Sequence, residues 1–165
     1  MNIVQSSVPE GYLRSTAGTE MLVHDVMTKD VISVSKLESI VLVGNILADK
    51  NISGLPVVDK EKKVVGIITQ ADILSIIGVR REHTFKDLLK YMLGEPLPQR
   101  RIGDMVGDIM TAPAVTIKPE MNIAEAVKIM DEKKIRRLLV VDGGNALIGI
   151  ITRADILKAV IRKLK

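Results

Sequence analysis

The sequence predicts a mixed α+β fold made of two β-α-β-β-α repeats, and three observations support this prediction. Residues 66–72 (GIITQAD) recur as residues 149–155 (GIITRAD), which is 149 − 66 = 83 positions later. Residues 23–77 align with residues 106–160 without a gap. Within each repeat, short runs of β-branched residues alternate with helical periodicity, which is typical of strands and amphipathic helices. A match of this length indicates one structural unit used twice.

The repeats also predict how the chain is divided. A single repeat of roughly 55 residues would be only marginally stable alone, because small domains bury too little surface. We therefore expect the two repeats to pack sheet to sheet with pseudo-twofold symmetry. The predicted organisation is a tail over residues 1–20, a first repeat over 21–78, a connecting segment with a helix over 79–104, and a second repeat over 105–165.

Each repeat begins with a D-h-M-T motif, where h is apolar, and the motif ends at Thr28 and Thr111. A short strand and then a helix are expected after it, and Ser39 and Asn122 are suitable N-caps for the two helices. The expected strands span residues 31–34 and 114–117. The apolar residues expected on the buried stripes of the helices are Ile40, Val43 and Leu47, and Ile123, Ala126, Val127 and Met130.

A β-hairpin and a final helix complete each repeat. The hairpin strands are expected at residues 55–59 and 64–68, and at 138–142 and 147–151. The intervening turns are short enough for direct hairpin connections. The final helices are expected over residues 69–77 and 152–164.

The composition excludes several kinds of site. The chain of 165 residues has 47% hydrophobic residues, enough for a core, and no cysteine. Disulfides, thiol catalysis and cysteine zinc sites are therefore excluded. With one Phe, two Tyr and no Trp, the chain lacks the aromatic platforms on which single-stranded nucleic acids stack. The net charge of +4 permits contact with polyanions without requiring it.

No catalytic or metal-binding set is evident in the sequence. His24 and His83 are the only histidines, and neither has the spacing of a metal pair. We find no Ser-His-Asp set and no Gly-rich phosphate loop, so we expect no enzyme activity and no metal. The sequence shows no signal peptide and no apolar run of the roughly 18 residues that a membrane span needs. We therefore expect a cytoplasmic protein without a membrane partner.

These motifs resemble the CBS domain family, and the resemblance covers residues 23–160. It depends on the D-h-M-T opening, the P-V-V-D strand and the G-h-h-T-x-x-D turn, with Leu139 replacing the proline in the second repeat. The resemblance implies a tandem pair, often called a Bateman module, with two clefts between the repeats. Such clefts often bind AMP, ADP, ATP or S-adenosylmethionine, and the modules commonly form disc-like homodimers.

The T-x-x-D turn has two compatible interpretations. Thr69 and Asp72 form a local capping arrangement at a helix start, and this needs no ligand. The same geometry also suits a nucleotide, because a carboxylate accepts hydrogen bonds from a ribose diol and helix N-terminal amides suit a phosphate. The resemblance favours the binding role for Asp72 and for its counterpart Asp155.

The family pattern implies two unequal sites, each drawing its turn from one repeat and its strand starts from the other. Site one would combine Thr69, Asp72, Ala112, Pro113, Ala114, Ile135, Arg136 and Arg137. Site two would combine Thr152, Arg153, Asp155, Asp30, Val31, Ile52, Ser53, Gly54 and Pro56. Arginine suits phosphate oxygens, so we expect site one to bind phosphorylated adenosine better.

The leading hypothesis is a regulatory module that senses an adenine nucleotide and signals to a protein on another chain. An S-adenosylmethionine sensor is the alternative within the same class. A nucleic-acid-binding accessory protein would instead use a basic helix at the end of the sequence and four arginines, which are Arg80, Arg81, Arg100 and Arg101. A scaffold whose clefts are empty and whose dimer face is the function is the third hypothesis.

Overall fold

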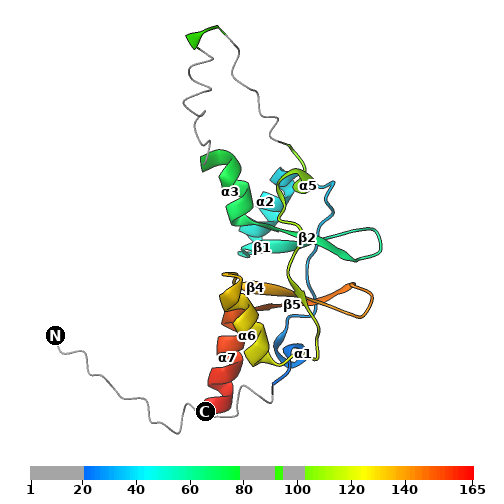
Figure 1. Ribbon diagram of the computed structural model, residues 1–165, viewed down its shortest axis with the longest axis vertical. Coiled ribbons are helices and arrows are strands. Elements are labelled where there is room, and N and C mark those ends of the chain that lie inside the picture. Colours follow the sequence, from blue (N-terminus) through cyan, green and yellow to red (C-terminus); the bar gives the residue numbers. More distant parts are fainter. Residues whose placement is uncertain (1–20, 79–91, 95–102) are drawn as a thin grey trace, which may run out of the picture. The chain divides into compact units, whose positions relative to one another are not determined.

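The computed structural model describes residues 21–78, 92–94 and 103–165, and it shows mixed α and β structure. In the first half the elements are α1 (Val23–Val26), α2 (Ile40–Asp49), β1 (Gly54–Val58), β2 (Val64–Thr69) and α3 (Gln70–Gly78) (Figure 1). In the second half they are α5 (Val106–Ile109), β3 (Thr116–Ile117), α6 (Ile123–Glu132), β4 (Arg137–Val141), β5 (Leu147–Thr152) and α7 (Arg153–Leu164). The α+β prediction is confirmed. The four linker arginines, His83 and the predicted helix between the repeats lie outside the described residues, apart from residues 92–94.

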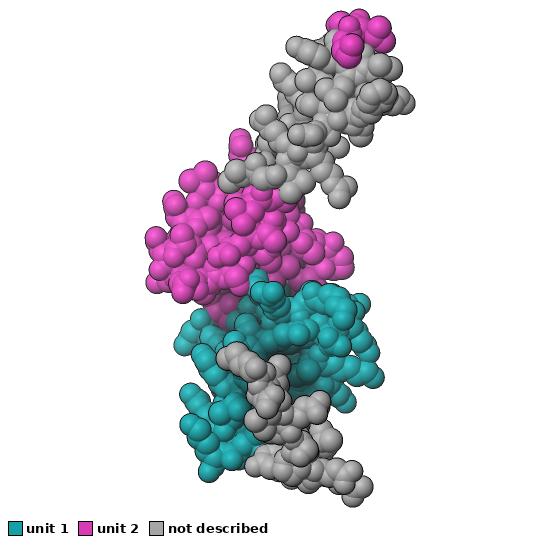
Figure 2. Space-filling view, turned by 90° about the vertical axis from the view of Figure 1, so that its left-hand side faces the viewer, with its two compact units in different colours: residues 1–30, 116–142, 148–165 teal, residues 31–115, 143–147 magenta. Residues whose placement is uncertain are grey.

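The chain forms two compact units (Figure 2). Each unit combines the opening segment of one repeat with the core of the other. Unit 1 comprises residues 1–30, 116–142 and 148–165, and unit 2 comprises residues 31–115 and 143–147. Helix α1 therefore groups with the core of the second repeat, and α5 groups with the core of the first.

In unit 2, β1 and β2 form an antiparallel hairpin in which Leu55 pairs with Ile68. The strand predicted over residues 31–34 is shorter than expected, because only Val34 bridges to Val57. A turn in which Glu38 N donates to Ser35 O at 3.1 Å follows at once and limits the extended segment. In unit 1, the corresponding strand β3 is also short and pairs in parallel with β4, giving the order β3-β4-β5.

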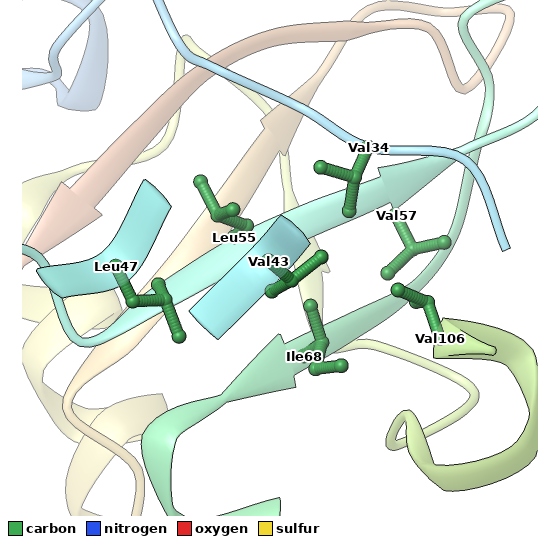
Figure 3. Close-up of a cluster of buried hydrophobic side chains, with 7 residues drawn as sticks. All are labelled: Val34, Val43, Leu47, Leu55, Val57, Ile68 and Val106. Atoms are coloured by element: carbon green, nitrogen blue, oxygen red, sulfur yellow. The ribbon is translucent and has the colours of Figure 1, made fainter. Parts of the chain in front are cut away.

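The core of unit 2 is entirely aliphatic (Figure 3). Val43 and Leu47 of α2 are 0% and 3% exposed, as the helical stripe predicts. Val106 of α5 belongs to the same core and is fully buried. Burying a side chain of this size stabilises the fold by about 1.5–3 kcal/mol. The cluster comprises Val34, Val43, Leu47, Leu55, Val57, Ile68 and Val106.

The core of unit 1 follows the same plan. Ile123, Ala126 and Met130 of α6 are buried as predicted. The placement of Val127 in this stripe is wrong, because its side chain is 42% exposed. Positions 123, 126 and 130 lie along one line of the helix, and residue 127 lies beside it, where it lines a surface groove.

Helices α1 and α5 are single turns that the strand and helix periodicity did not predict. The aspartate of each D-h-M-T motif explains them. Asp25 Oδ2 accepts a hydrogen bond from Leu22 N at 3.1 Å, and Asp108 Oδ2 accepts one from Met105 N at 3.2 Å. Each carboxylate thus satisfies an amide that the helix start would otherwise leave without a partner. None of the helices in the described part of the chain is long and apolar enough to cross a membrane.

Candidate ligand-binding site

Thr69 and Asp72 form a reciprocal hydrogen-bonded turn where β2 runs into α3. Asp72 Oδ2 accepts from Thr69 N at 2.8 Å and from Thr69 Oγ1 at 2.9 Å. In return, Asp72 N donates to Thr69 Oγ1 at 3.2 Å. Both residues are partly buried. The predicted capping arrangement is therefore present, and it holds the Asp72 carboxylate in one orientation at the helix start.

The second repeat builds the same turn in unit 1. Asp155 Oδ2 accepts from Thr152 N at 3.0 Å and from Thr152 Oγ1 at 2.8 Å, and Asp155 N donates to Thr152 Oγ1 at 3.1 Å. Asp155 is also partly buried. The sequence repeat thus corresponds to a repeat in side-chain geometry.

Thr111 adds a long-range contact to the Asp72 turn. Its hydroxyl donates to Asp72 Oδ1 at 3.2 Å. Its backbone pairs with Ile67 of β2, with N–H···O distances of 2.8 and 3.0 Å. The opening motif of the second repeat therefore lies along the edge of β2 in unit 2, and both Asp72 oxygens accept hydrogen bonds.

Thr28 is the counterpart of Thr111 in unit 1, but its hydroxyl makes no bond to Asp155, the described counterpart of Asp72. Its backbone pairs with Ile150 of β5 in the same way, at 2.8 and 3.0 Å. Among the residues that the structure describes, none donates a hydrogen bond to Asp155 Oδ1. Within the described residues the two carboxylates therefore differ, because Asp72 accepts hydrogen bonds at both oxygens and Asp155 accepts them at Oδ2.

The glycine of each G-h-h-T-x-x-D motif allows this close approach of the opening segment. A Cβ on Gly66 would lie 2.9 Å from both Met110 Sδ and the Thr111 carbonyl oxygen. A Cβ on Gly149 would lie 2.5 Å from Met27 Sδ and 3.0 Å from the carbonyl oxygen of Thr28. Both glycines are buried. Close packing, which is a common reason for glycine within strands, explains both positions.

Several predicted site residues share a unit with their turn. Ala112, Pro113 and Ala114 directly follow Thr111 in unit 2, with Ala112 and Pro113 exposed and Ala114 half-buried. Asp30 is exposed and belongs to unit 1, as do Thr152, Arg153 and Asp155. These parts of the two predicted sites are therefore brought into the same units.

The other predicted site residues belong to the opposite unit from their turn. Ile135, Arg136 and Arg137 are in unit 1, and Val31, Ile52, Ser53, Gly54 and Pro56 are in unit 2. Within the units, Gln70 N donates to Ser53 O and Arg153 N donates to Arg136 O, each at 3.0 Å. The predicted pairing of Arg136 with Asp72, and of Ser53 with Asp155, joins different units and stays a prediction.

A small cavity lies beside Asp155 within unit 1. It has a volume of about 210 Å³, and its lining includes Asp155, Lys158 and Arg162 of α7 and Asp25 of α1. Complete ligand pockets usually measure about 300–1,000 Å³, so this cavity by itself is smaller than a complete ligand pocket. Across the residues that the structure describes, no three His, Cys, Asp or Glu side chains gather as a metal site would need.

Comparison with known proteins decides the family. The family model of the CBS domain matches residues 23–79 and 106–162. The chain belongs to the CBS domain family. A relative in Methanocaldococcus jannaschii, the uncharacterized protein MJ1426, is 34% identical to it over an alignment of 158 residues that covers 87% of this chain and 94% of that protein.

Solved structures of CBS pairs resemble this chain over most of its length. The crystal structure of CBSX2 from Arabidopsis thaliana in complex with AMP has 29% identity and a TM-score of 0.70, and the match covers 87% of this chain and 98% of that one. The CBS domain pair of MJ0100 in complex with 5′-methylthioadenosine and S-adenosyl-L-methionine has 26% identity and a TM-score of 0.69, with the same coverage. The tandem CBS organisation predicted from the sequence is confirmed.

Sequence reasoning missed two features of this CBS pair. The threonine of the D-h-M-T motif had no assigned role, yet Thr111 contacts Asp72 directly. The recurrence of this threonine at the same position of both repeats could have indicated that it has a structural role. The cations Lys158 and Arg162 were also missed beside Asp155. They follow Asp155 by three and seven positions, which is the spacing of one helix face.

Proposed function

We propose that this CBS pair binds an adenosyl ligand and acts as a ligand-sensing regulatory module. The observation that carries the proposal is the pair of Thr-Asp turns, in which Asp72 and Asp155 are held at helix starts by the preceding threonines. A carboxylate fixed in this way accepts hydrogen bonds from a ribose diol without losing further side-chain entropy. The adjacent helix N-terminus favours a phosphate.

The ligands of the two similar structures support the adenosyl class. One of those proteins is in complex with AMP, and the other with 5′-methylthioadenosine and S-adenosyl-L-methionine. These molecules share the adenosine part and differ in charge and in the 5′ substituent. AMP, ADP and ATP are our first candidates and S-adenosylmethionine is the alternative, because arginines at 136 and 137 suit phosphate oxygens.

A thermal-shift screen tests the proposal directly. We expect at least one of AMP, ADP, ATP, S-adenosylmethionine and NAD to raise the unfolding temperature, because a ligand that binds only the folded state stabilises it. The absence of any shift at millimolar concentration would contradict the proposal. Binding of DNA or RNA that weakens steeply with salt would instead favour the nucleic-acid hypothesis.

Titration calorimetry on variants then tests whether each of the two carboxylates contributes to ligand binding. Asp72→Asn and Asp155→Asn keep the side-chain shape but weaken acceptance from a diol, so each should lower ligand affinity. Asp59→Asn is the matched control, because Asp59 Oδ1 accepts from Glu61 N at 2.8 Å and Lys63 N at 3.0 Å in a hairpin turn. An equal loss in the control would indicate a general effect on folding.

We further propose that each site is completed by strand starts of the other repeat, as the family resemblance implies. A double-mutant cycle tests this pairing. Arg136→Ala should couple to Asp72→Asn in the affinity for ATP and should be additive with Asp155→Asn. Coupling to Asp155→Asn alone would overturn the proposed pairing. It would leave intact the separate proposal that the chain binds an adenosyl ligand.

Regulation completes the proposal. A ligand changes the conformation only if it binds two states with different affinity, and we propose that a protein on another chain responds to that change. We also propose that the module is a cytoplasmic homodimer without enzyme activity. Light scattering with and without the ligand identified by the screen would measure the oligomeric state, and a monomer under both conditions would contradict the dimer.

A further inference from the structure

Helices α6 and α7 of unit 1 lie side by side (Figure 1). Their side chains form a largely apolar groove on the surface between them. The groove has a volume of about 500 Å³. Val127 on α6 and Leu157 on α7 line it and are 42% and 62% exposed. Apolar side chains also continue along α7 at Ile161 and Leu164, which are 46% and 48% exposed.

The two ends of the groove are different. At one end Arg153 Nη2 lies 3.7 Å from Asp131 Oδ1, so a pair of opposite charges closes the groove. At the other end Ala124 and Val160 line it, and the apolar surface of α7 continues beyond them. A partner segment that enters from the Ala124 end would therefore meet mainly apolar contacts, with Lys128 as the one charged side chain among the described residues that line the groove before the Asp131–Arg153 pair.

The chain itself arrives at that end. Ile123 N, at the start of α6, donates to Met21 O at 3.0 Å, and Leu22 bridges to Asn122. Residues 1–20, which precede this contact, lie outside the described residues. They include six larger apolar side chains, which are Met1, Ile3, Val4, Val8, Tyr12 and Leu13.

We propose that the segment of residues 1–20 docks in the α6–α7 groove of its own chain, with Tyr12 and Leu13 as the apolar contacts. Leu13 is 21 − 13 = 8 residues from Met21, so it can reach up to about 26 Å from that point. The groove runs along α6 from Ala124 to Asp131, and this rise of seven positions spans roughly 10 Å. The tether also gives a local concentration in the millimolar range, which favours this segment over a second copy of the chain.

A nitroxide label tests the proposal, because the chain has no cysteine and Glu10→Cys introduces a single labelling site. In the full-length protein, the label should remove most of the NMR signal intensity of the Val127, Leu157 and Val160 methyl groups. The exposed Leu74, which is the repeat counterpart of Leu157, should keep its intensity. Uniform intensity at all four positions would overturn the proposal.

Two further measurements separate the other possible occupants. Mixing spin-labelled chains with isotope-enriched chains that carry no spin label should produce no signal loss, and a loss in this mixture would overturn the proposal by showing that another copy fills the groove. Leu157→Asp, at an exposed position where folding tolerates a charge, should restore the methyl intensities of Val127 and Val160. Leu74→Asp should leave the signal loss unchanged. Persistence of the loss in Leu157→Asp would overturn the proposed docking site.

Discussion

Thr111 Oγ1 donates a hydrogen bond to Asp72 Oδ1 at 3.2 Å, across 39 positions of the chain. The bond joins the opening motif of the second repeat to the strand-to-helix turn of the first. The Asp72 carboxylate is therefore oriented by a local threonine and by a distant one. In the other turn, Thr152 alone among the described residues holds Asp155.

Replacement of Thr111 by valine tests this contact. Thr111→Val keeps the side-chain shape and removes the donor, so we expect the free energy of unfolding to fall by about 0.5–1 kcal/mol, the lower part of the range for a hydrogen bond, because Thr111 is exposed. Urea unfolding would measure the change. Thr28→Val is the matched control and should be neutral, and an equal loss in both variants would contradict a role for the Asp72 bond.

The capping role of Thr152 predicts an effect without any ligand. Thr152→Val removes the hydroxyl that accepts from Asp155 N and donates to Asp155 Oδ2. Loss of an N-cap of this kind costs about 0.5–2 kcal/mol, which chemical unfolding of the ligand-free protein would show. Thr152→Ser retains the hydroxyl and should stay close to wild type. Unchanged stability in the valine variant would contradict the capping role.

The two strand glycines should not tolerate a methyl group. Gly66→Ala and Gly149→Ala place a Cβ within 3.0 Å of a methionine sulfur and a backbone carbonyl oxygen. Overpacking of this kind typically costs about 1–3 kcal/mol, so both unfolding midpoints should fall. Gly143→Ala serves as the control, because a Cβ there meets no atom within 4 Å. Wild-type midpoints for all three would show that the opening segments move aside easily.

The cations beside Asp155 predict a charge-dependent ligand preference. Lys158 and Arg162 line the cavity next to this carboxylate, whereas α3 (Gln70–Gly78) contains no Lys or Arg. Both cations are exposed, so we expect Lys158→Gln to weaken ATP binding by only about two- to fivefold, as surface charges do. Binding of S-adenosylmethionine should weaken less. Titration calorimetry with both ligands would measure the difference. An equal loss of affinity for both ligands would show that Lys158 does not contribute to phosphate binding.

The contacts that sequence reasoning predicted are those that form over a few positions. Ser39 caps α2 by accepting from Leu42 N at 3.2 Å, and Asn122 caps α6 by accepting from Ala124 N at 2.8 Å. Such bonds depend on residue type at a fixed short spacing, so they can be predicted directly from the sequence. Val127 was misplaced because residues beside a helical stripe are buried only when a neighbouring element covers them.

The sequence by itself determined that the chain contains two equivalent α+β repeats and that each has a Thr-Asp turn at a helix start. These features follow from local periodicity and from hydrogen bonds between residues three positions apart. Only the tertiary structure decided that α1 and α5 each group with the core of the other repeat, and that the distant Thr111 contacts Asp72 in addition to the nearby Thr69. The physical reason is that the backbone pairing of Thr111 with Ile67 brings the Thr111 hydroxyl to Asp72. Residue spacing alone does not show which strand edge pairs with Thr111, or that Gly66 leaves room for this segment.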